Sequence, residues 1–426
     1  MDNKLAEFLT DEKNPKVLRF LLLAGVICFT EWVLLGIAAM TPLIFIKLPL
    51  FAIAALMLWV GVKLAVKIHH SLGGRNMKAL RLPENCVWRI YTGGKLKGMW
   101  QGVEREDNHY PEDWVGSVIT CNNASRPDEA GTGLSRVEGG ALLRDLIAAD
   151  PVGMLGEGHV ARFGTDTALL VKVLDASTRL AIQAHPTRPD AQKYFHSPYG
   201  KTEAWYVLAT GEKGGKIYAG FKEGVTEEKW RALFDAQDVP GMLDCMHHLT
   251  VQPGDLILLE GGVPHAIDAG CLIAEIQEPT DYTLRTERIS PLGMPMKDDD
   301  LHQGAGFEAM FAMFRYEGLS EEVTLARWCK QPRLFHETPG GRMDTLLDEN
   351  DTPCFSLRRL TVHGEYAQPA AETFRVVIVA SGEGTLTASG ETLPLKQGDY
   401  LFLPAALGEA VWSGDMTVLE CIPPKK

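Results

Sequence analysis

Two polar side chains, Gln183 and His185, alternate in the otherwise apolar run RLAIQAHP. Residues two apart on a strand point to the same face, so both side chains should project together. Glu203 opens the apolar run EAWYVLATG, and His265 closes the run PGDLILLEGGVPH. An amide oxygen, two imidazoles and a carboxylate, without a thiolate, are typical ligands of a divalent metal. We therefore predict a zinc site at these four residues, whose donors would also suit manganese, iron, cobalt or nickel.

Cationic side chains fall close to these ligands along the chain. Lys201 lies two residues before Glu203 and should share its face of the strand. Lys172 belongs to the strand that precedes Gln183, and Arg285 follows in the segment EIQEPTDYTLRTERISP. A single lysine or arginine is most often a solvated surface residue. The shared strand face makes Lys201 the strongest candidate for a cation beside the metal.

Two carboxylates, Glu275 and Glu278, lie in the run LIAEIQE that comes after His265. A charged residue in an apolar strand needs a partner, which favours a functional site over a plain core. Either glutamate can supply the carboxylate of a pocket.

Short β-type runs position these residues. From Thr167 onward, runs such as ALLVKVLDA and KIYAGF are separated by Gly, Pro, Asp and Asn, a pattern typical of a mainly β domain. Helix-forming segments interrupt it at residues 226–249 and 307–330, and residues 352–424 return to the β pattern.

An internal repeat indicates the architecture. Lys201–Glu212 aligns without gaps on Glu372–Glu383, and Pro253–Ile267 aligns on Gln397–Val411. Two copies of one β unit predict two jelly-roll barrels, the double-cupin fold with helical insertions.

The same repeat compares the chemistry of the two barrels. The gapless alignment places Phe374 opposite Glu203 and Glu409 opposite His265. The second barrel therefore lacks the ligands, and we expect one Zn²⁺ per chain, bound by the first.

Residues 1–76 differ in kind from the rest. Two apolar stretches, 18–40 and 43–66, are each long enough to cross a bilayer, although Glu31 and Lys47 interrupt them. Basic residues flank both outer ends, so a two-helix membrane hairpin would leave the following domain in the cytoplasm, attached to the inner face of the membrane. The alternative is an over-extended reading frame, with the functional chain starting at Met77.

Composition limits the partners. The formal net charge of −13 disfavours a nucleic-acid partner, because phosphate backbones require a basic surface. The eight cysteines form no CxxC pair, which suits reduced thiols in the cytoplasm. The sequence makes no prediction of the oligomeric state.

The predicted segments are a hydrophobic extension at 1–76, a first barrel with the metal site at 77–300, a helical or linker segment at 301–351, and a second barrel at 352–426.

The motifs QAHP, lysine-x-glutamate, PHA and an arginine twenty residues later together resemble type I mannose-6-phosphate isomerase, a zinc-dependent cupin family. The resemblance spans the chain from Met77 to the C-terminus. It implies reversible conversion of mannose 6-phosphate to fructose 6-phosphate through a cis-enediol. It also implies the following roles: zinc ligands Gln183, His185, Glu203 and His265; active-site cations Lys201 and Arg285; Lys172 near the substrate; and Glu275 in proton transfer.

The chain departs from the family pattern at three positions. Thr187 stands where an aspartate usually follows QAHP, Thr202 where a proline precedes the glutamate, and Ala181 where a serine is associated with the phosphate. Two other functions compete: another metal-dependent cupin enzyme, such as a different sugar-phosphate isomerase or an oxygenase, and a membrane-tethered regulator that binds sugar phosphates.

Overall fold

Strands dominate the part of the chain that the computed structural model describes, residues 77–123 and 131–425. These residues form three sheets that belong to one unit, Asn76–Lys426. The predicted mainly β fold is confirmed. The predicted N-terminal hairpin lies outside the described residues, and no described helix is long and apolar enough to cross a membrane.

The first barrel consists of two sheets that enclose a common core. One sheet has the order β13 (Cys329–Lys330), β9 (Leu256–Leu259), β6 (Glu203–Thr210), β11 (Cys271–Gln277), β4 (Leu170–Ala176), β3 (Glu112–Val115) and β2 (Cys86–Val87). The other has the order β12 (Leu284–Arg285), β5 (Gln183–Ala184), β10 (His265–Ile267), β7 (Gly215–Phe221) and β8 (Met246–Val251). Trp205 and Ile273 from the first sheet pack with Ile217 from the second, all fully buried.

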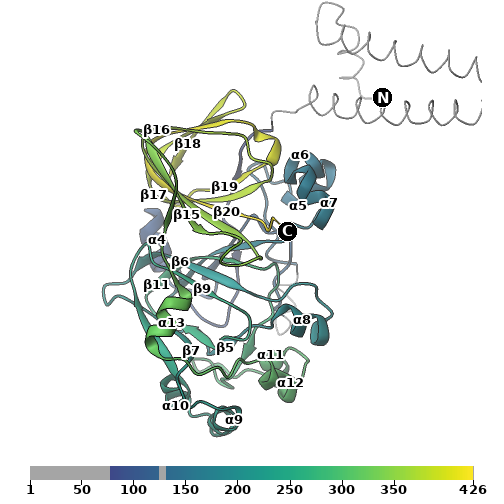
Figure 1. Cartoon of the computed structure of the whole chain (residues 1–426), viewed down its shortest axis with the longest axis vertical. Coiled ribbons are helices and arrows are strands. Elements are labelled where there is room, and N and C mark those ends of the chain that lie inside the picture. Colours follow the sequence, from purple (N-terminus) through teal and green to yellow (C-terminus); the bar gives the residue numbers. More distant parts are fainter. Residues whose placement is uncertain (1–76, 124–130, 426) are drawn as a thin grey trace, which may run out of the picture. The chain divides into compact units, whose positions relative to one another are not determined.

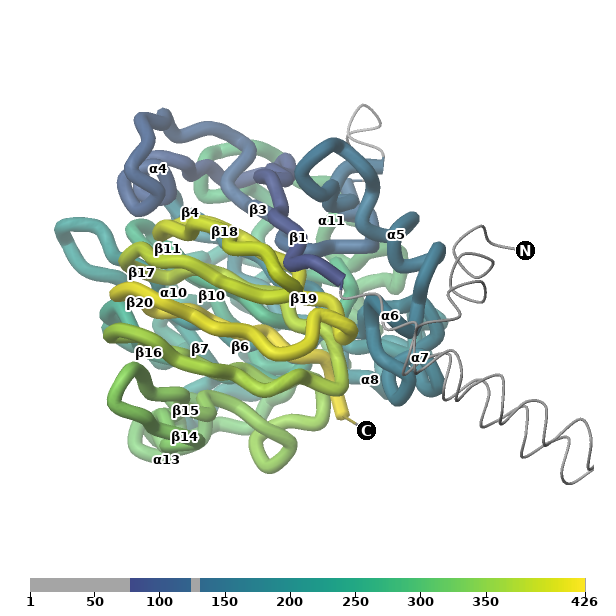
Figure 2. The backbone as a smooth tube through the Cα atoms, turned by 90° about the horizontal axis from the view of Figure 1, so that it is seen from above, coloured from purple at the N-terminus to yellow at the C-terminus, as the bar shows by residue number. Residues whose placement is uncertain are grey.

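The second barrel is built from one sheet of eight described strands. Its order is β1 (Leu80–Leu82), β19 (Tyr400–Leu403), β17 (Arg375–Ala388), β20 (Ala410–Ile422), β16 (Ser356–Gln368), β15 (Gly341–Leu347) and β14 (Arg333–Thr338), with β18 (Glu391–Lys396) paired to β17. Figure 2 shows β16, β20, β17 and β18 side by side as one layer. Strand alternation sends Leu360, Val377 and Val418 into its core.

A second apolar layer joins the two barrels. Val171 and Val173 leave the opposite face of β4 from Lys172, and they belong to the same cluster as Leu419 and Cys421 of β20. Burying apolar surface on both faces explains why these strands read as continuous apolar runs rather than as simple alternation. The barrels are therefore packed against each other, as Figure 1 shows for β6 and β20.

The described structure corrects the repeat alignment by one residue. The amide of Val207 bonds to the carbonyl of Asp255, and the amide of Val379 makes the same bond to Asp399. Because Asp255 and Asp399 are equivalent in the repeat, Val207 corresponds to Val379, and Glu203 corresponds to Arg375 rather than to Phe374. The strand pairing gives the same correspondence, since Arg375 pairs with Leu403 of β19 as Glu203 pairs with Leu259 of β9.

Two predicted segment boundaries also differ from the sheets. β1, expected in the first barrel, pairs with β19 of the second. The segment 301–351 was expected to be helical or linker, but this is wrong from Cys329 onward. β14 and β15 form a hairpin closed by Pro339 and Gly340, and β15 pairs with β16. Turn residues between two extended runs favour such a hairpin.

Helices cover the ends of the barrels. They are α4 (Lys95–Gln101), α5 (Leu143–Ala149), α6 (Pro151–Leu155), α7 (Glu157–Phe163), α8 (Arg188–Phe195), α9 (Glu227–Ala236), α10 (Val239–Asp244), α11 (Asp298–His302), α12 (Phe307–Ala312) and α13 (Glu321–Trp328). The Thr226 side chain caps α9 by accepting from the amide of Lys229, and Trp230 and Phe234 share its buried face. The predicted helical insertions are thus present, and residues of α11 line the cavity that also contacts β5.

Candidate metal centre and adjoining cavity

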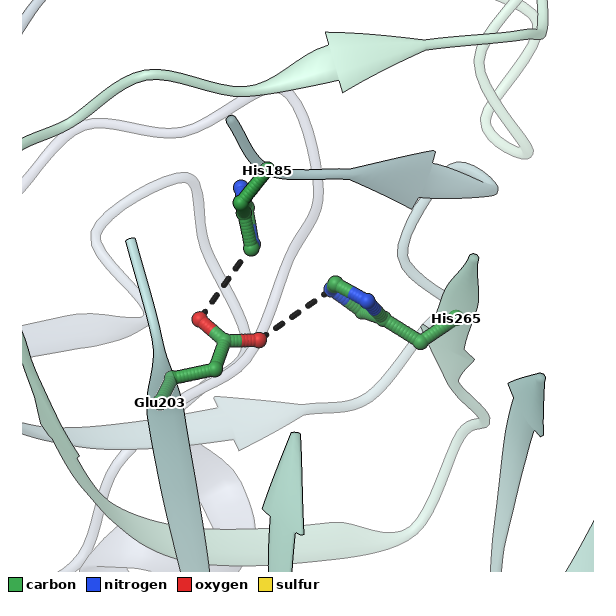
Figure 3. Close-up of side chains that lie close together, drawn as sticks. All are labelled: His185, Glu203 and His265. Carbon is green, nitrogen blue, oxygen red and sulfur yellow. Dashed lines mark ion pairs between the residues drawn. The ribbon is translucent and has the colours of Figure 1, made fainter. Parts of the chain in front are cut away.

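Three side chains from separate strands meet inside the first barrel. His185 directly follows β5, Glu203 begins β6 and His265 begins β10, and the ligand atoms of all three lie within 4.8 Å of one another. Figure 3 shows the Glu203 carboxylate facing both imidazoles. Its two oxygens each lie 3.2 Å from an Nε2 atom, Oε2 from His185 and Oε1 from His265. No more than 2% of any of the three side chains is exposed.

The hydrogen bonds of the His185 and His265 rings determine which ring nitrogen is protonated and which one carries the lone pair near the Glu203 carboxylate. His185 Nδ1 lies 2.8 Å from the carbonyl of Tyr282, and His265 Nδ1 lies 2.9 Å from that of Val263. A carbonyl can only accept, so each Nδ1 carries the proton and a neutral ring presents a lone pair at Nε2. Burial lowers the pKa of both histidines, and the charge of Lys201 lowers them further. Both rings are therefore neutral.

The Glu203 carboxylate is buried and charged. Burial acts to raise its pKa, but the nearby charge of Lys201 leaves the pKa below its ordinary value. Neither oxygen accepts a hydrogen bond of acceptable geometry from the described residues. Lone pairs of two neutral imidazoles and an anionic carboxylate thus converge on one point, an arrangement that a cation stabilises. The donor set fits Zn²⁺.

Gln183 completes the set from β5. It pairs with His265 in the strand register, and its Nε2 lies 3.4 Å from His265 Nε2. Rotation of the amide end for end would turn its oxygen toward the same point. The structure therefore brings together all four residues that the sequence predicted as ligands.

Lys201 brings a positive charge to the same point. Its Nζ lies 3.1 Å from Glu203 Oε2 and 2.9 Å from His185 Nε2. The side chain is only 4% exposed, as expected for a residue on the ligand face of the strand. A buried ammonium in contact with a carboxylate and an imidazole can donate to both, and it also borders the cavity described next.

A cavity of about 310 Å³ adjoins the metal centre. The sequence-predicted residues that line it are Lys172, Gln183, Lys201, Glu275 and Arg285. Lys172 and Glu275 pair in the register of β4 and β11, with Nζ 3.0 Å from Oε2. Arg285 has no carboxylate within ion-pair distance among the described residues and donates to the carbonyl of Asp300 at 2.9 Å. Its charge is therefore available to an anionic ligand.

The structure separates the two candidate carboxylates. Glu275 faces the cavity and accepts from Trp205 Nε1 at 3.2 Å. Glu278 lies outside it, where it pairs with Arg188 at 2.5 Å and accepts from the amide of Thr202 at 2.9 Å. Glu275 is the carboxylate that a substrate in the cavity would meet, whereas Glu278 fixes the loop before β6.

Two parts of the chain match families of known proteins. Residues 103–208 match the family described as phosphomannose isomerase type I, catalytic domain, and residues 349–423 match the mannose-6-phosphate isomerase cupin domain. These two regions of the chain are therefore similar to the catalytic and cupin domains of type I phosphomannose isomerases. The match agrees with the motifs around the metal centre, since the first of these regions contains three of the four candidate ligands.

Individual members of the isomerase family are distant relatives. A mannose-6-phosphate isomerase of Streptococcus mutans is 26% identical over 273 residues, 63% of this chain and 79% of the relative. Mannose-6-phosphate isomerase ManA of Bacillus subtilis is 27% identical over 254 residues, 60% of this chain and 73% of the relative.

Solved structures of phosphomannose isomerases share the fold. The mannose 6-phosphate isomerase from Bacillus subtilis superposes with a TM-score of 0.64 at 22% identity, covering 81% of this chain and 99% of that one. A mannose 6-phosphate isomerase bound with zinc and yttrium gives a TM-score of 0.59 at 16% identity, covering 82% and 100%. The cupin-type fold of the family is therefore confirmed for this chain.

A charged wall behind the cavity was missed by sequence reasoning. Glu112 in β3 accepts from Tyr91 at 2.8 Å and from Trp114 at 2.9 Å, and it pairs with Arg89 at 2.9 Å. Arg89 also pairs with Asp281 at 3.2 Å. Burial acts to raise the pKa of Glu112, but Arg89 and Lys172 hold it well below its ordinary range. The only signal in the sequence was a pair of acidic residues in the apolar run EDWV.

None of the three departures from the family pattern falls on a candidate ligand, and only Ala181 lines the cavity. This chain therefore offers a methyl group there instead of a hydroxyl. The Thr187 side chain caps α8 by accepting from the amide of Asp190. The backbone of Thr202 donates to Glu278, a bond that proline could not make.

Proposed function

We propose that this chain interconverts mannose 6-phosphate and fructose 6-phosphate, with one Zn²⁺ bound by Gln183, His185, Glu203 and His265. The observation that carries the proposal is the convergence of neutral imidazole lone pairs on the buried Glu203 carboxylate, beside a cavity lined by Lys172, Lys201, Glu275 and Arg285. The similarity to mannose-6-phosphate isomerases of Streptococcus mutans and Bacillus subtilis supports the same reaction.

The reaction moves a proton between C2 and C1 of the open-chain sugar. A carboxylate at hydrogen-bond distance from both carbons can take the proton from C2 and return it to C1 through a cis-enediol. We assign this role to Glu275, the one of the two candidate carboxylates that lines the cavity. Its partner Lys172, with Nζ 3.0 Å from Oε2, holds the carboxylate in place. A bound zinc ion would supply charge stabilisation to the substrate oxygens.

Cations of the chain stabilise the remaining negative charges. Lys201 donates from the wall shared by the metal centre and the cavity, where it can stabilise an oxygen that becomes charged in the enediolate. Arg285 lacks a carboxylate partner among the described residues, so its guanidinium can bind the phosphate of the substrate. Both side chains act through charge that water does not screen, because the site is buried.

A coupled assay of fructose 6-phosphate formation from mannose 6-phosphate tests the proposal. The full chain should be active with zinc, and Glu203→Ala should lose both the zinc and the activity. His248→Ala is the matched control, because His248 is an exposed histidine on β8 of the same barrel. Full activity in the zinc-free protein would disprove the metal assignment, and absence of activity in the zinc-loaded protein would disprove the reaction.

A further inference from the structure

The second barrel contains a cluster of charged residues at the positions that correspond to the candidate active site of the first barrel. In the first barrel, Glu275 pairs in register with Lys172 on one side and with Trp205 on the other. In the second, Glu420 pairs with Arg358 on one side and with Val377 on the other. Since Trp205 corresponds to Val377, Glu420 occupies the position of Glu275.

Two arginines accompany this glutamate. The pairing of Arg358 with Glu420 gives Arg358 the position of Lys172, and the corrected register gives Arg375 the position of Glu203. A guanidinium therefore stands where the first barrel has its metal-binding carboxylate. The second barrel has lost the metal ligands but has kept an anion and gained a fixed cation at the same place.

The arginine at the base of this group is buried and incompletely bonded. Arg375 Nη1 pairs with Glu420 at 3.1 Å, with 5% and 0% of the side chains exposed. Gln368 donates to both carboxylate oxygens, at 2.9 and 3.1 Å, and accepts from Trp412 Nε1 at 2.8 Å. Arg375 Nε has no hydrogen-bond partner among the described residues. Arg375 also lines a cleft, so this donor can bind a ligand there.

A cleft of about 1080 Å³ opens over this group. Arg358 lines it with its guanidinium 4.0 Å from the centre of the Phe335 ring, and no carboxylate of the described residues lies within ion-pair distance of it. A guanidinium stacked on a ring keeps its in-plane N–H donors free, and these donors match the oxygens of a phosphate. Phe335 is 53% exposed, so the ring also offers an apolar face to a ligand.

The other side chains of the cleft can bind a ligand that carries several hydroxyl groups. The carboxylates of Glu157 and Glu372 and the amide of Gln368 can accept from hydroxyls, and the Tyr366 ring adds a second aromatic surface. We infer that this cleft, defined by Arg358, Arg375, Gln368, Phe335, Tyr366 and Glu372, is a second ligand site for a small phosphorylated polyol or sugar. Its phosphate would bind Arg358, and its hydroxyls would bind the carboxylates. The site needs no metal and does not depend on the proposed isomerase reaction.

Equilibrium dialysis of the full chain with radiolabelled inorganic phosphate tests the site. Arg358→Ala should bind one phosphate fewer per chain than the wild type, or bind that phosphate about tenfold more weakly, because it loses a charge-assisted contact. Arg359→Ala is the matched control. Arg359 is the next residue on β16, on the opposite face, where it pairs with Asp344 at 2.8 Å. It should bind as the wild type does.

Two further measurements complete the test. Arg358→Gln keeps a stem to pack on Phe335, so it should show the same loss if the alanine variant does not fold. Sorbitol 6-phosphate should bind to the wild-type cleft more tightly than inorganic phosphate, and Arg358→Gln should weaken its binding too. The same number of phosphates and the same affinity in Arg358→Gln, Arg359→Ala and the wild type would overturn the inference. All variants keep the cavity of the first barrel unchanged, so a difference in phosphate binding between them reports on the second site alone. The result is therefore valid whether or not the first cavity is an isomerase site.

Discussion

Lys201 Nζ lies 3.1 Å from Glu203 Oε2, and Lys201 stands two residues before Glu203, where β6 begins. The ammonium neutralises part of the charge that the carboxylate would otherwise present to a metal, while it also faces the cavity. Metal binding and substrate chemistry therefore share one side chain, and the two roles can be separated by substitution.

Lys201→Met should lower kcat by about 10²–10⁴-fold, the usual effect of losing a positioned acid or charge-stabilising group. Its zinc content should stay at that of the wild type, because the lysine is not a donor to the metal. Steady-state kinetics and elemental analysis of the same preparation check both parts. A kcat within threefold of the wild type would contradict the role of Lys201.

Glu275→Gln should lower kcat by about 10²-fold or more while it preserves the shape of the side chain. Glu278→Gln is the natural comparison, because Glu278 lies three residues along the chain but outside the cavity. It should keep kcat near the wild type and lower the melting temperature, since the amide no longer pairs with Arg188 at 2.5 Å. The reverse ranking of the two kcat values would assign the proton transfer to Glu278.

Removal of the metal should lower the melting temperature of the wild type. A ligand that binds only the folded chain stabilises it by about 2.7 kcal/mol when its concentration is one hundred times its dissociation constant. Calorimetry with and without a zinc chelator measures the difference. In Glu203→Gln the chelator should have no effect, and an equal shift in both proteins would place the stabilising metal elsewhere.

Acid should destabilise the chain through His159, which links α7 to the second barrel. Its ring is 2% exposed, lies 5.2 Å from the Phe374 ring, and has Nε2 2.7 Å from the carbonyl of Asp166. Burial lowers its pKa, and the Asp166 carbonyl only partly offsets this. The unfolded chain therefore binds the proton more readily, so stability falls as the pH drops below about 6.5, by at most about 1.4 kcal/mol per pH unit for this group.

The measurement is the loss of melting temperature between pH 7.5 and pH 5.5. The loss should be smaller in His159→Asn than in the wild type, because the titrating group is gone. In His248→Asn it should be unchanged, since that histidine is exposed in the folded chain as well. An equal loss in all three proteins would show that His159 does not contribute to the pH dependence.

The sequence alone predicted the four candidate ligands and the class of fold. Gln183 and His185 share a face because strand side chains alternate, and Lys201 and Glu203 share one for the same reason. Side chains alternate between the two faces of a strand in every β fold, so residue types and spacing were enough to predict which side chains lie together. The internal repeat likewise predicted a second barrel without ligands.

Only the tertiary structure decided what depends on pairing between strands. Glu275 and Glu278 are three residues apart and point to different surroundings, and which of them meets the cavity is set by the pairing of β11 with β4 and β6. A gapless alignment does not show how strands pair, and it is the pairing of β17 with β19 that places Arg375 rather than Phe374 at the position of Glu203. Arg89 and Glu112 come from segments far from the motif. Long-range hydrogen bonds bring them together, and no local pattern encodes those bonds.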